Sequence, residues 1–217
     1  MITKLDFSRS ALLMVDVQND FCPKGALEVE NGDQVIEPLN RLASLFAGRS
    51  GRIIATQDWH PANHLSFASS HENKKPGDTV NLPGVMGQIL WPRHCVQGSA
   101  GAEFHEKLET KPVNLILRKG FRTGLDSYSA FFENDRKTST GLDGFLKALS
   151  IDTLVLGGLA LDYCVLYSAL DAVSLGYNTI IAGDAVWGVD FPGGSIKQAF
   201  KRLDEAGIIV TESGDIQ

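Results

Sequence analysis

Cysteine is scarce in this chain of 217 residues, which contains three. Cys22, Cys95 and Cys164 are odd in number, widely spaced and include no CxxC pair. Small secreted domains that depend on disulfides usually carry even sets of cysteines. The sequence therefore argues against a disulfide framework and predicts reduced thiols, as in a cytoplasmic protein.

Long apolar runs and basic stretches are missing as well. No run approaches the roughly 20 residues that cross a bilayer, and residues 1–6 lack the apolar core of a secretion signal. The net charge is −6 and no basic stripe is present, which argues against a nucleic-acid partner. We expect a soluble cytoplasmic protein that binds neither membranes nor nucleic acids.

The chain does contain short apolar runs that alternate with helix-like segments. Runs typical of buried parallel strands lie at 11–15, 53–56, 113–117, 153–156, 179–182 and 208–210. Segments with helical spacing of apolar residues lie at 33–47, 142–149, 165–175 and 195–206. This alternation predicts an α/β fold: a doubly wound, mostly parallel six-stranded sheet with helices on both faces, in three layers. The length suits one domain over 1–217.

One connection, residues 61–112, is much longer than the others. It holds Pro, Gly, Trp and His but little regular pattern. Loops of this length in compact domains are usually functional or disordered. We expect this segment to cover the site rather than to form a separate domain.

Reactive side chains follow four of the predicted strands. Asp16 follows the first, Asp58 and His60 follow the second, Lys119 follows the third, and Cys164 comes shortly after the fourth. In open α/β sheets, ligands bind beyond the carboxyl ends of the strands. The sequence therefore predicts that these side chains converge at one edge of the sheet.

Cys164 admits two interpretations. At the first turn of a helix, its thiol would be biased towards the thiolate that attacks carbonyl carbons. Alternatively, it is a buried core cysteine that behaves as a small hydrophobe. Asp16 as a proton acceptor and Lys119 as a cation would support the first interpretation, although either could instead be a turn cap or a solvated strand end.

Asp58 and His60 also suggest a metal site. In an extended segment, residues two apart point the same way, and His64 and His94 lie nearby in the sequence. Histidines with a carboxylate suit Zn²⁺, Fe²⁺ or Mn²⁺. The alternative is a helix-capping aspartate beside a surface histidine.

Aromatic residues offer a further candidate feature. An apolar slot for a flat ring could be lined by Phe21, Trp91, Tyr128 and Phe131. Ordinary core packing explains the same residues equally well, so the sequence leaves both interpretations open.

At these residues the chain resembles the nicotinamidase/pyrazinamidase group of the isochorismatase-like cysteine hydrolases. The resemblance extends over about 11–210. The segments that carry it are 15–22, 25–27, 57–61, 63–64, 66–68, 91–97, 119–120, 126–132 and 162–165.

The resemblance implies a doubly wound α/β enzyme that hydrolyses nicotinamide to nicotinate and ammonia through a cysteine thioester, as in NAD salvage, and that also acts on pyrazinamide. It implies Asp16, Lys119 and Cys164 as a catalytic triad. It also implies a non-proline cis peptide between Leu159 and Ala160, which would aim the N–H groups of Ala160 and Cys164 at the substrate oxygen.

The resemblance further implies one divalent metal ion, zinc before iron or manganese, held by Asp58, His60 and His94. His64 matches a position that serves some relatives as a further ligand. Substrate-pocket positions match Phe21, Trp91, Leu159, Ala160 and Tyr163. One departure is Leu161, where many relatives have Thr.

Two other functions stay open from the sequence, and so does self-association. The first function is an amidase for another small amide, such as an N-carbamoyl compound. Relatives of that kind share the aspartate, lysine and cysteine but typically lack the aspartate–histidine metal set. The second is a non-catalytic metal- or ligand-binding protein on the same fold. Folds of this kind often self-associate as homo-oligomers, but the sequence does not fix the oligomeric state.

Overall fold

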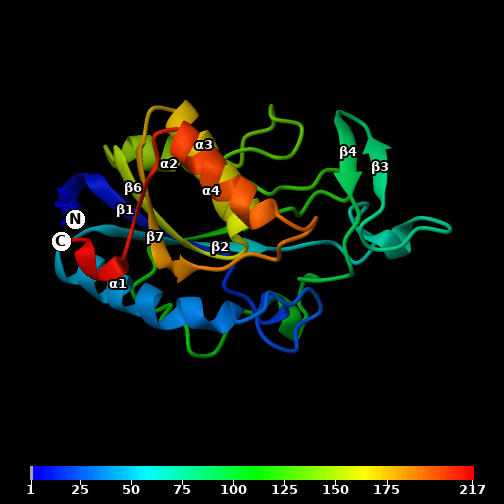
Figure 1. Ribbon diagram of the computed structural model, residues 1–217, viewed down its shortest axis with the longest axis horizontal. Coiled ribbons are helices and arrows are strands. Elements are labelled where there is room, and N and C mark those ends of the chain that lie inside the picture. The colour runs from blue at the N-terminus through cyan, green and yellow to red at the C-terminus, as the bar shows by residue number, and fades with distance from the viewer. Residues whose placement is uncertain (1) are drawn as a thin grey trace.

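A computed structural model describes residues 2–217, and its centre is a six-stranded parallel sheet (Figure 1). The strand order is β5-β2-β1-β6-β7-β8. The strands are β1 (Ser10–Val15), β2 (Arg52–Asp58), β5 (Leu115–Lys119), β6 (Thr153–Gly158), β7 (Asn178–Val186) and β8 (Ile209–Thr211). The predicted doubly wound sheet is confirmed.

Helices cover both faces of this sheet. In Figure 1, α1 (Ile36–Gly48) lies on one side, and α2 (Leu142–Ala148), α3 (Leu166–Ser174) and α4 (Ser195–Glu205) lie on the other. None of the helices within residues 2–217 is both long and apolar enough to cross a membrane.

Alternation along each strand divides the core into two halves. In β1, Leu12 and Met14 belong to the cluster beneath α1, whereas Leu13 and Val15 belong to the cluster beneath α2, α3 and α4. Successive side chains of a strand point to opposite faces, so a strand covered on both sides must be apolar at every position. This explains the continuous apolar runs of the sequence.

Several element bounds differ from the prediction. The third predicted strand, 113–117, lies two residues further on, because β5 pairs with β2 from Ile54–Leu115 to Asp58–Lys119. Lys119 is therefore the last strand residue and lies directly beside Asp58. The predicted helix at 165–175 is preceded by a π-helical turn, Leu161–Val165, and α3 begins at Leu166.

The long connection at 61–112 also has structure that the sequence did not predict. It contains an antiparallel hairpin of β3 (Thr79–Leu82) and β4 (Val85–Ile89), which lies apart from the main sheet (Figure 1). The same connection supplies Trp91 and His94 to the cavity described below.

The chain leaves β1 in one direction to build β2 and β5, and it returns on the other side to build β6, β7 and β8. The order therefore reverses between β1 and β6. In open α/β sheets, such a switch point opens a crevice at the carboxyl ends of the strands. Asp16 follows β1 directly, and the turn that holds Cys164 follows β6.

Candidate active site

Three neighbouring strands deliver Asp16, Lys119 and Asp58 to this crevice. Asp16 has a positive φ of 48°, so the chain turns sharply as it leaves β1. Its carboxylate is oriented by Thr56 on β2, whose hydroxyl donates to Asp16 Oδ1 at 2.6 Å. The second oxygen, Oδ2, faces Lys119. Thr56 thus leaves one Asp16 oxygen free to act on neighbouring groups.

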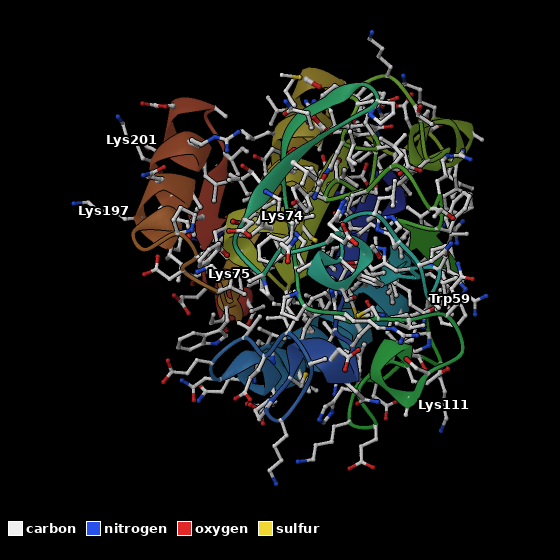
Figure 2. The ribbon with its side chains drawn as sticks, turned by 90° about the vertical axis from the view of Figure 1, so that its right-hand side faces the viewer. Trp59, Lys74, Lys75, Lys111, Lys197 and Lys201 are labelled. Carbon is white, nitrogen blue, oxygen red and sulfur yellow. The ribbon has the colours of Figure 1, made fainter. Side chains whose placement is uncertain are left out.

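Lys119 connects the cluster. Its Nζ lies 2.8 Å from Asp16 Oδ2 and 3.4 Å from Cys164 Sγ, and it also pairs with Asp58 Oδ1. It is completely buried. Other lysines differ: Figure 2 shows Lys111, Lys197 and Lys201 extending outwards from the ribbon. A fully buried ammonium group requires such partners, since an unpaired one would be too costly.

These contacts determine the charges of the cluster. Burial alone lowers the pKa of Lys119, but the carboxylates of Asp16 and Asp58 outweigh it and hold that pKa well above its ordinary value. Burial raises the pKa of Asp16, and Lys119 only partly offsets this effect. For Asp58, Lys119 and His60 together overcome the effect of burial and lower the pKa. The site therefore holds a permanent cation and an aspartate of increased basicity.

The thiol of Cys164 differs from expectation. Burial raises its pKa well above the ordinary value, Lys119 lowers it, and Asp16 and Asp58 raise it again. The raised pKa does not support a bias towards thiolate among these protein groups, so a base is needed to remove the proton of Cys164 when it attacks.

The segment before Cys164 provides a backbone donor. The peptide bond between Leu159 and Ala160 is cis, as the resemblance implied. Within residues 2–217, no protein group accepts a hydrogen bond from the Ala160 N–H. Ala160 and Cys164 both line the cavity. A free N–H beside a thiol is the arrangement that an oxyanion site requires.

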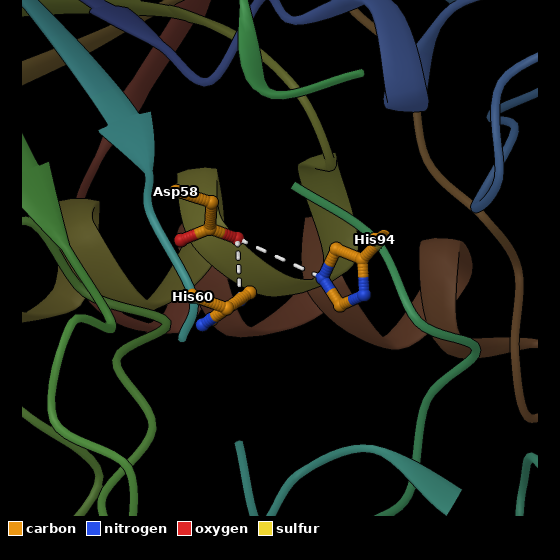
Figure 3. A group of neighbouring side chains, drawn as sticks. All are labelled: Asp58, His60 and His94. Carbon is orange, nitrogen blue, oxygen red and sulfur yellow. Dashed lines mark ion pairs between the residues drawn. The ribbon is translucent and has the colours of Figure 1, made fainter. Parts of the chain in front are cut away.

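A second cluster lies next to the first. His60 Nε2 is 3.6 Å and His94 Nε2 is 4.0 Å from Asp58 Oδ2 (Figure 3). Ligand atoms of Asp58, His60 and His94 all lie within 4.8 Å of one another, and all three residues are buried. Carboxylate and imidazole donors at such separations suit a divalent transition metal.

The hydrogen bonds at Nδ1 of His60 and His94 indicate whether each ring could bind a metal through Nε2. His60 Nδ1 contacts the Gly120 carbonyl and His94 Nδ1 contacts the Pro92 carbonyl, each at 2.8 Å. A carbonyl can only accept, so each Nδ1 carries a hydrogen, and Nε2, which faces Asp58, is the atom through which each neutral ring could bind a metal. Burial lowers the pKa of His94 to about 4, which keeps it neutral. Both histidines therefore fit a metal.

His64 differs from these two. Its Nδ1 contacts both the backbone N–H of Ser66 at 3.1 Å and the Ser66 hydroxyl at 2.7 Å, and its buried Nε2 has no hydrogen-bond partner among residues 2–217. His64 groups with His60 and Asp126, whose ligand atoms lie within 4.8 Å, rather than with Asp58 and His94.

A cavity joins the two clusters. Its lining includes the predicted pocket residues Phe21, Trp91, Ala160 and Tyr163, together with Asp58, His60, His94 and Cys164. Leu159 does not line it, because its side chain is fully buried in the core beneath α1. Phe131 is likewise a core residue.

Four further residues line the cavity: Leu27, Asp126, Tyr128 and Val189. The sequence predicted no role for three of them and left the role of Tyr128 open. Tyr128 had been weighed as a slot residue. Asp126 and Leu27 lie in segments that carry the resemblance, which was the only sequence signal for them. Val189 lies in none of these segments, so nothing in the sequence indicated that it lines the cavity.

Glu133 is a buried carboxyl close to Asp126. Its side chain is 1% exposed, and burial raises its pKa from 4.5 to about 7. Between those values the native state binds more protons than the unfolded state, so the free energy of unfolding falls as pH rises. Glutamine does not titrate, so Glu133→Gln lacks this fall in the free energy of unfolding. From pH 5 to pH 8, the free energy of unfolding of the variant should therefore rise by about 2 kcal/mol relative to that of the wild type.

Urea unfolding at several pH values measures this difference. Glu72→Gln, at an exposed position, is the control. A difference between Glu133→Gln and wild type that does not vary with pH contradicts the prediction.

The comparisons with known proteins agree with this geometry. Residues 10–215 match the family model described as the isochorismatase domain. The chain belongs to the isochorismatase family. Within this family, a nicotinamidase of Acinetobacter baylyi is 48% identical over 198 residues, which cover 91% of this chain and 90% of the relative.

Two solved structures of family members extend the comparison. The nicotinamidase/pyrazinamidase of Acinetobacter baumanii is 46% identical with a TM-score of 0.91, covering 96% of this chain and 98% of that chain. A pyrazinamidase of Pyrococcus horikoshii in complex with zinc is 31% identical with a TM-score of 0.76, covering 94% and 99%. The predicted membership of the nicotinamidase/pyrazinamidase group is confirmed.

Proposed function

We propose that this chain is a nicotinamidase: it hydrolyses nicotinamide to nicotinate and ammonia, a reaction of NAD salvage, and also accepts pyrazinamide. The observation that carries the proposal is the buried Lys119, which contacts Asp16, Asp58 and the Cys164 thiol at once. This contact places a nucleophile and its base directly beside the histidine cluster and an aromatic cavity. The nicotinamidase and pyrazinamidase relatives support the substrate.

The reaction begins with proton transfer from Cys164 to Asp16. The raised pKa of Asp16 makes it a better base, and Lys119 stabilises the thiolate as it forms. The sulfur attacks the carboxamide carbon, and its bond to carbon forms as the C=O electrons move to oxygen. The N–H groups of Ala160 and Cys164 stabilise this oxyanion, at about 3 kcal/mol per donor.

Collapse of this intermediate breaks the C–N bond. Asp16 returns its proton to the departing nitrogen, which leaves as ammonia, and a thioester to Cys164 remains. Water, deprotonated by Asp16, then attacks the thioester. Nicotinate leaves, and the proton returns to the sulfur, which restores the resting thiol.

Asp58, His60 and His94 would hold one divalent cation, with zinc as the proposed metal. The zinc complex of the Pyrococcus pyrazinamidase supports this choice. When bound, the ion supplies a Lewis-acidic position beside the aromatic walls, suited to a pyridine nitrogen. His64 is left out of the ligand set because it groups with His60 and Asp126 rather than with Asp58 and His94.

The test is ammonia release from nicotinamide with and without a chelator. We expect activity that falls at least about 100-fold on chelation and returns with zinc, since loss of a metal site or of its supporting groups typically costs 10- to 100-fold or more. His94→Ala should reduce bound metal from one ion per chain to a small fraction. His105→Ala, away from the site, should leave metal content unchanged. Full activity after metal removal contradicts the metal proposal.

A panel of nicotinamide, pyrazinamide and an N-carbamoyl compound separates this function from the alternative amidase. A cation held by Asp58, His60 and His94 would favour a substrate whose ring nitrogen can bind it. We also propose one domain over 1–217, a cytoplasmic location and self-association. Gel filtration with light scattering tests the last of these.

A further inference from the structure

Gln88 is a buried polar residue on a largely exposed hairpin. It lies on β4, outside the main sheet, where Met86 is 81% exposed but Gln88 is 3% exposed. Burying an amide is costly unless all its polar atoms find partners. The contacts of Gln88 therefore show what this burial serves.

Both ends of the amide are used. Gln88 Nε2 lies 3.1 Å from Asp126 Oδ2, 3.1 Å from the Tyr128 hydroxyl and 2.9 Å from the Ile89 carbonyl. Gln88 Oε1 accepts from Asn134 Nδ2 at 3.0 Å. One hairpin side chain thus reaches three residues that lie 38 to 46 positions further along the chain.

The direction of the amide is set by a backbone group. The N–H of Tyr128 donates to Asn134 Oδ1 at 2.9 Å, so the opposite atom of Asn134 is the NH₂ group. That group must face an oxygen, which assigns Oε1 of Gln88 to this side. The Gln88 NH₂ group is consequently directed at Asp126 and Tyr128.

Both of these partners form walls of the cavity. The Tyr128 hydroxyl also accepts from Trp91 Nε1 at 3.0 Å, and the two rings pack edge to face. Asp126 faces His60 and His64. Gln88 itself does not line the cavity that contains Cys164.

We propose that Gln88 is a positioning residue that determines how tightly the site binds an aromatic ring. It acts through Tyr128, and through Tyr128 on Trp91, and it links the hairpin to the cavity walls. This inference rests on the proposed function, because its ligand is the pyridine ring. Gln88 touches no reacting atom, so it affects ring binding and leaves the chemical step almost unchanged.

The decisive variant is Gln88→Met, which keeps the length of the side chain and removes every hydrogen bond. KM for nicotinamide should rise about tenfold, and the dissociation constant for nicotinate should rise by the same factor. The value of kcat should change less than threefold. Met86→Ala on the same strand is the matched control, with KM and kcat as in wild type.

A double-mutant cycle with Tyr128→Phe shows whether Gln88 acts through the hydroxyl. In the Tyr128→Phe background, Gln88→Met should raise KM less than threefold, because the bond to the Tyr128 hydroxyl, through which Gln88 is proposed to act, is already lost. Additive effects overturn the proposal. So does a KM within twofold of wild type for Gln88→Met, or a fall in kcat with KM unchanged.

If Gln88→Met does not accumulate as folded protein, Asn134→Ala replaces it. This variant removes the partner of Gln88 Oε1 and should raise KM severalfold at unchanged kcat; an unchanged KM counts against the inference. Wild-type protein that releases no ammonia from nicotinamide would instead contradict the proposed function. Failure of the inference about Gln88 and failure of the proposed function therefore give different results.

Discussion

Cys164→Ala is expected to lower the rate of ammonia release from nicotinamide by roughly 10⁴- to 10⁶-fold, the range known for loss of a nucleophile from a catalytic triad. The remaining groups cannot form the thioester. Because the aromatic walls and the histidine cluster are unaffected, the dissociation constant for nicotinamide should stay within about threefold of wild type. Rate assays together with calorimetric titration measure both quantities.

Cys22→Ala is the matched control for this experiment. Cys22 is also a free buried cysteine, but it belongs to the core beneath α1 and does not line the cavity. Its substitution should leave kcat near that of wild type. If Cys164→Ala retains an appreciable fraction of the wild-type rate, the covalent mechanism is incorrect.

Lys119→Met is expected to remove both activity and a large part of the stability. The variant leaves the carboxylates of Asp16 and Asp58 buried without the cation that pairs with both. Breaking a buried ion pair from one side typically costs about 3–5 kcal/mol. We expect a loss of about 3 kcal/mol in the free energy of unfolding and a fall in kcat of at least about 1,000-fold.

Urea unfolding and ammonia release measure these two effects separately. Lys111→Met is the control, because Lys111 extends outwards from the surface (Figure 2). It should change the free energy of unfolding by less than about 0.5 kcal/mol. A Lys119→Met protein with wild-type stability would show that Lys119 is not the cation that compensates these carboxylates.

Much of the fold follows from local pattern. The apolar runs predicted all six strands of the main sheet. The inner strands β1, β2, β6 and β7 are largely buried on both faces, and such strands are apolar without interruption, whereas the edge strands β5 and β8 carry exposed apolar residues. Their exact bounds were not predictable. The register of β5 against β2, which brings Lys119 beside Asp58, depends on pairing between segments about 60 residues apart.

The candidate site, like the fold, could be predicted only in part from the sequence. Asp16, Asp58, His60, Lys119 and Cys164 were found from the sequence because each lies at or near the end of a strand. The catalytic and ligand roles of these residues stay predictions. Gln88 had no signal, because its burial arises from contacts with Asp126, Tyr128 and Asn134 far along the chain.

The layered α/β architecture, the edge of the sheet at which reactive groups gather, and the resemblance to the family could all be predicted from the sequence, because periodicity and residue type are local properties. The directions of the pKa shifts could not be predicted: two buried carboxylates raise the pKa of Lys119, and burial raises the pKa of Cys164. Those depend on burial and on distances between segments that the chain brings together only on folding.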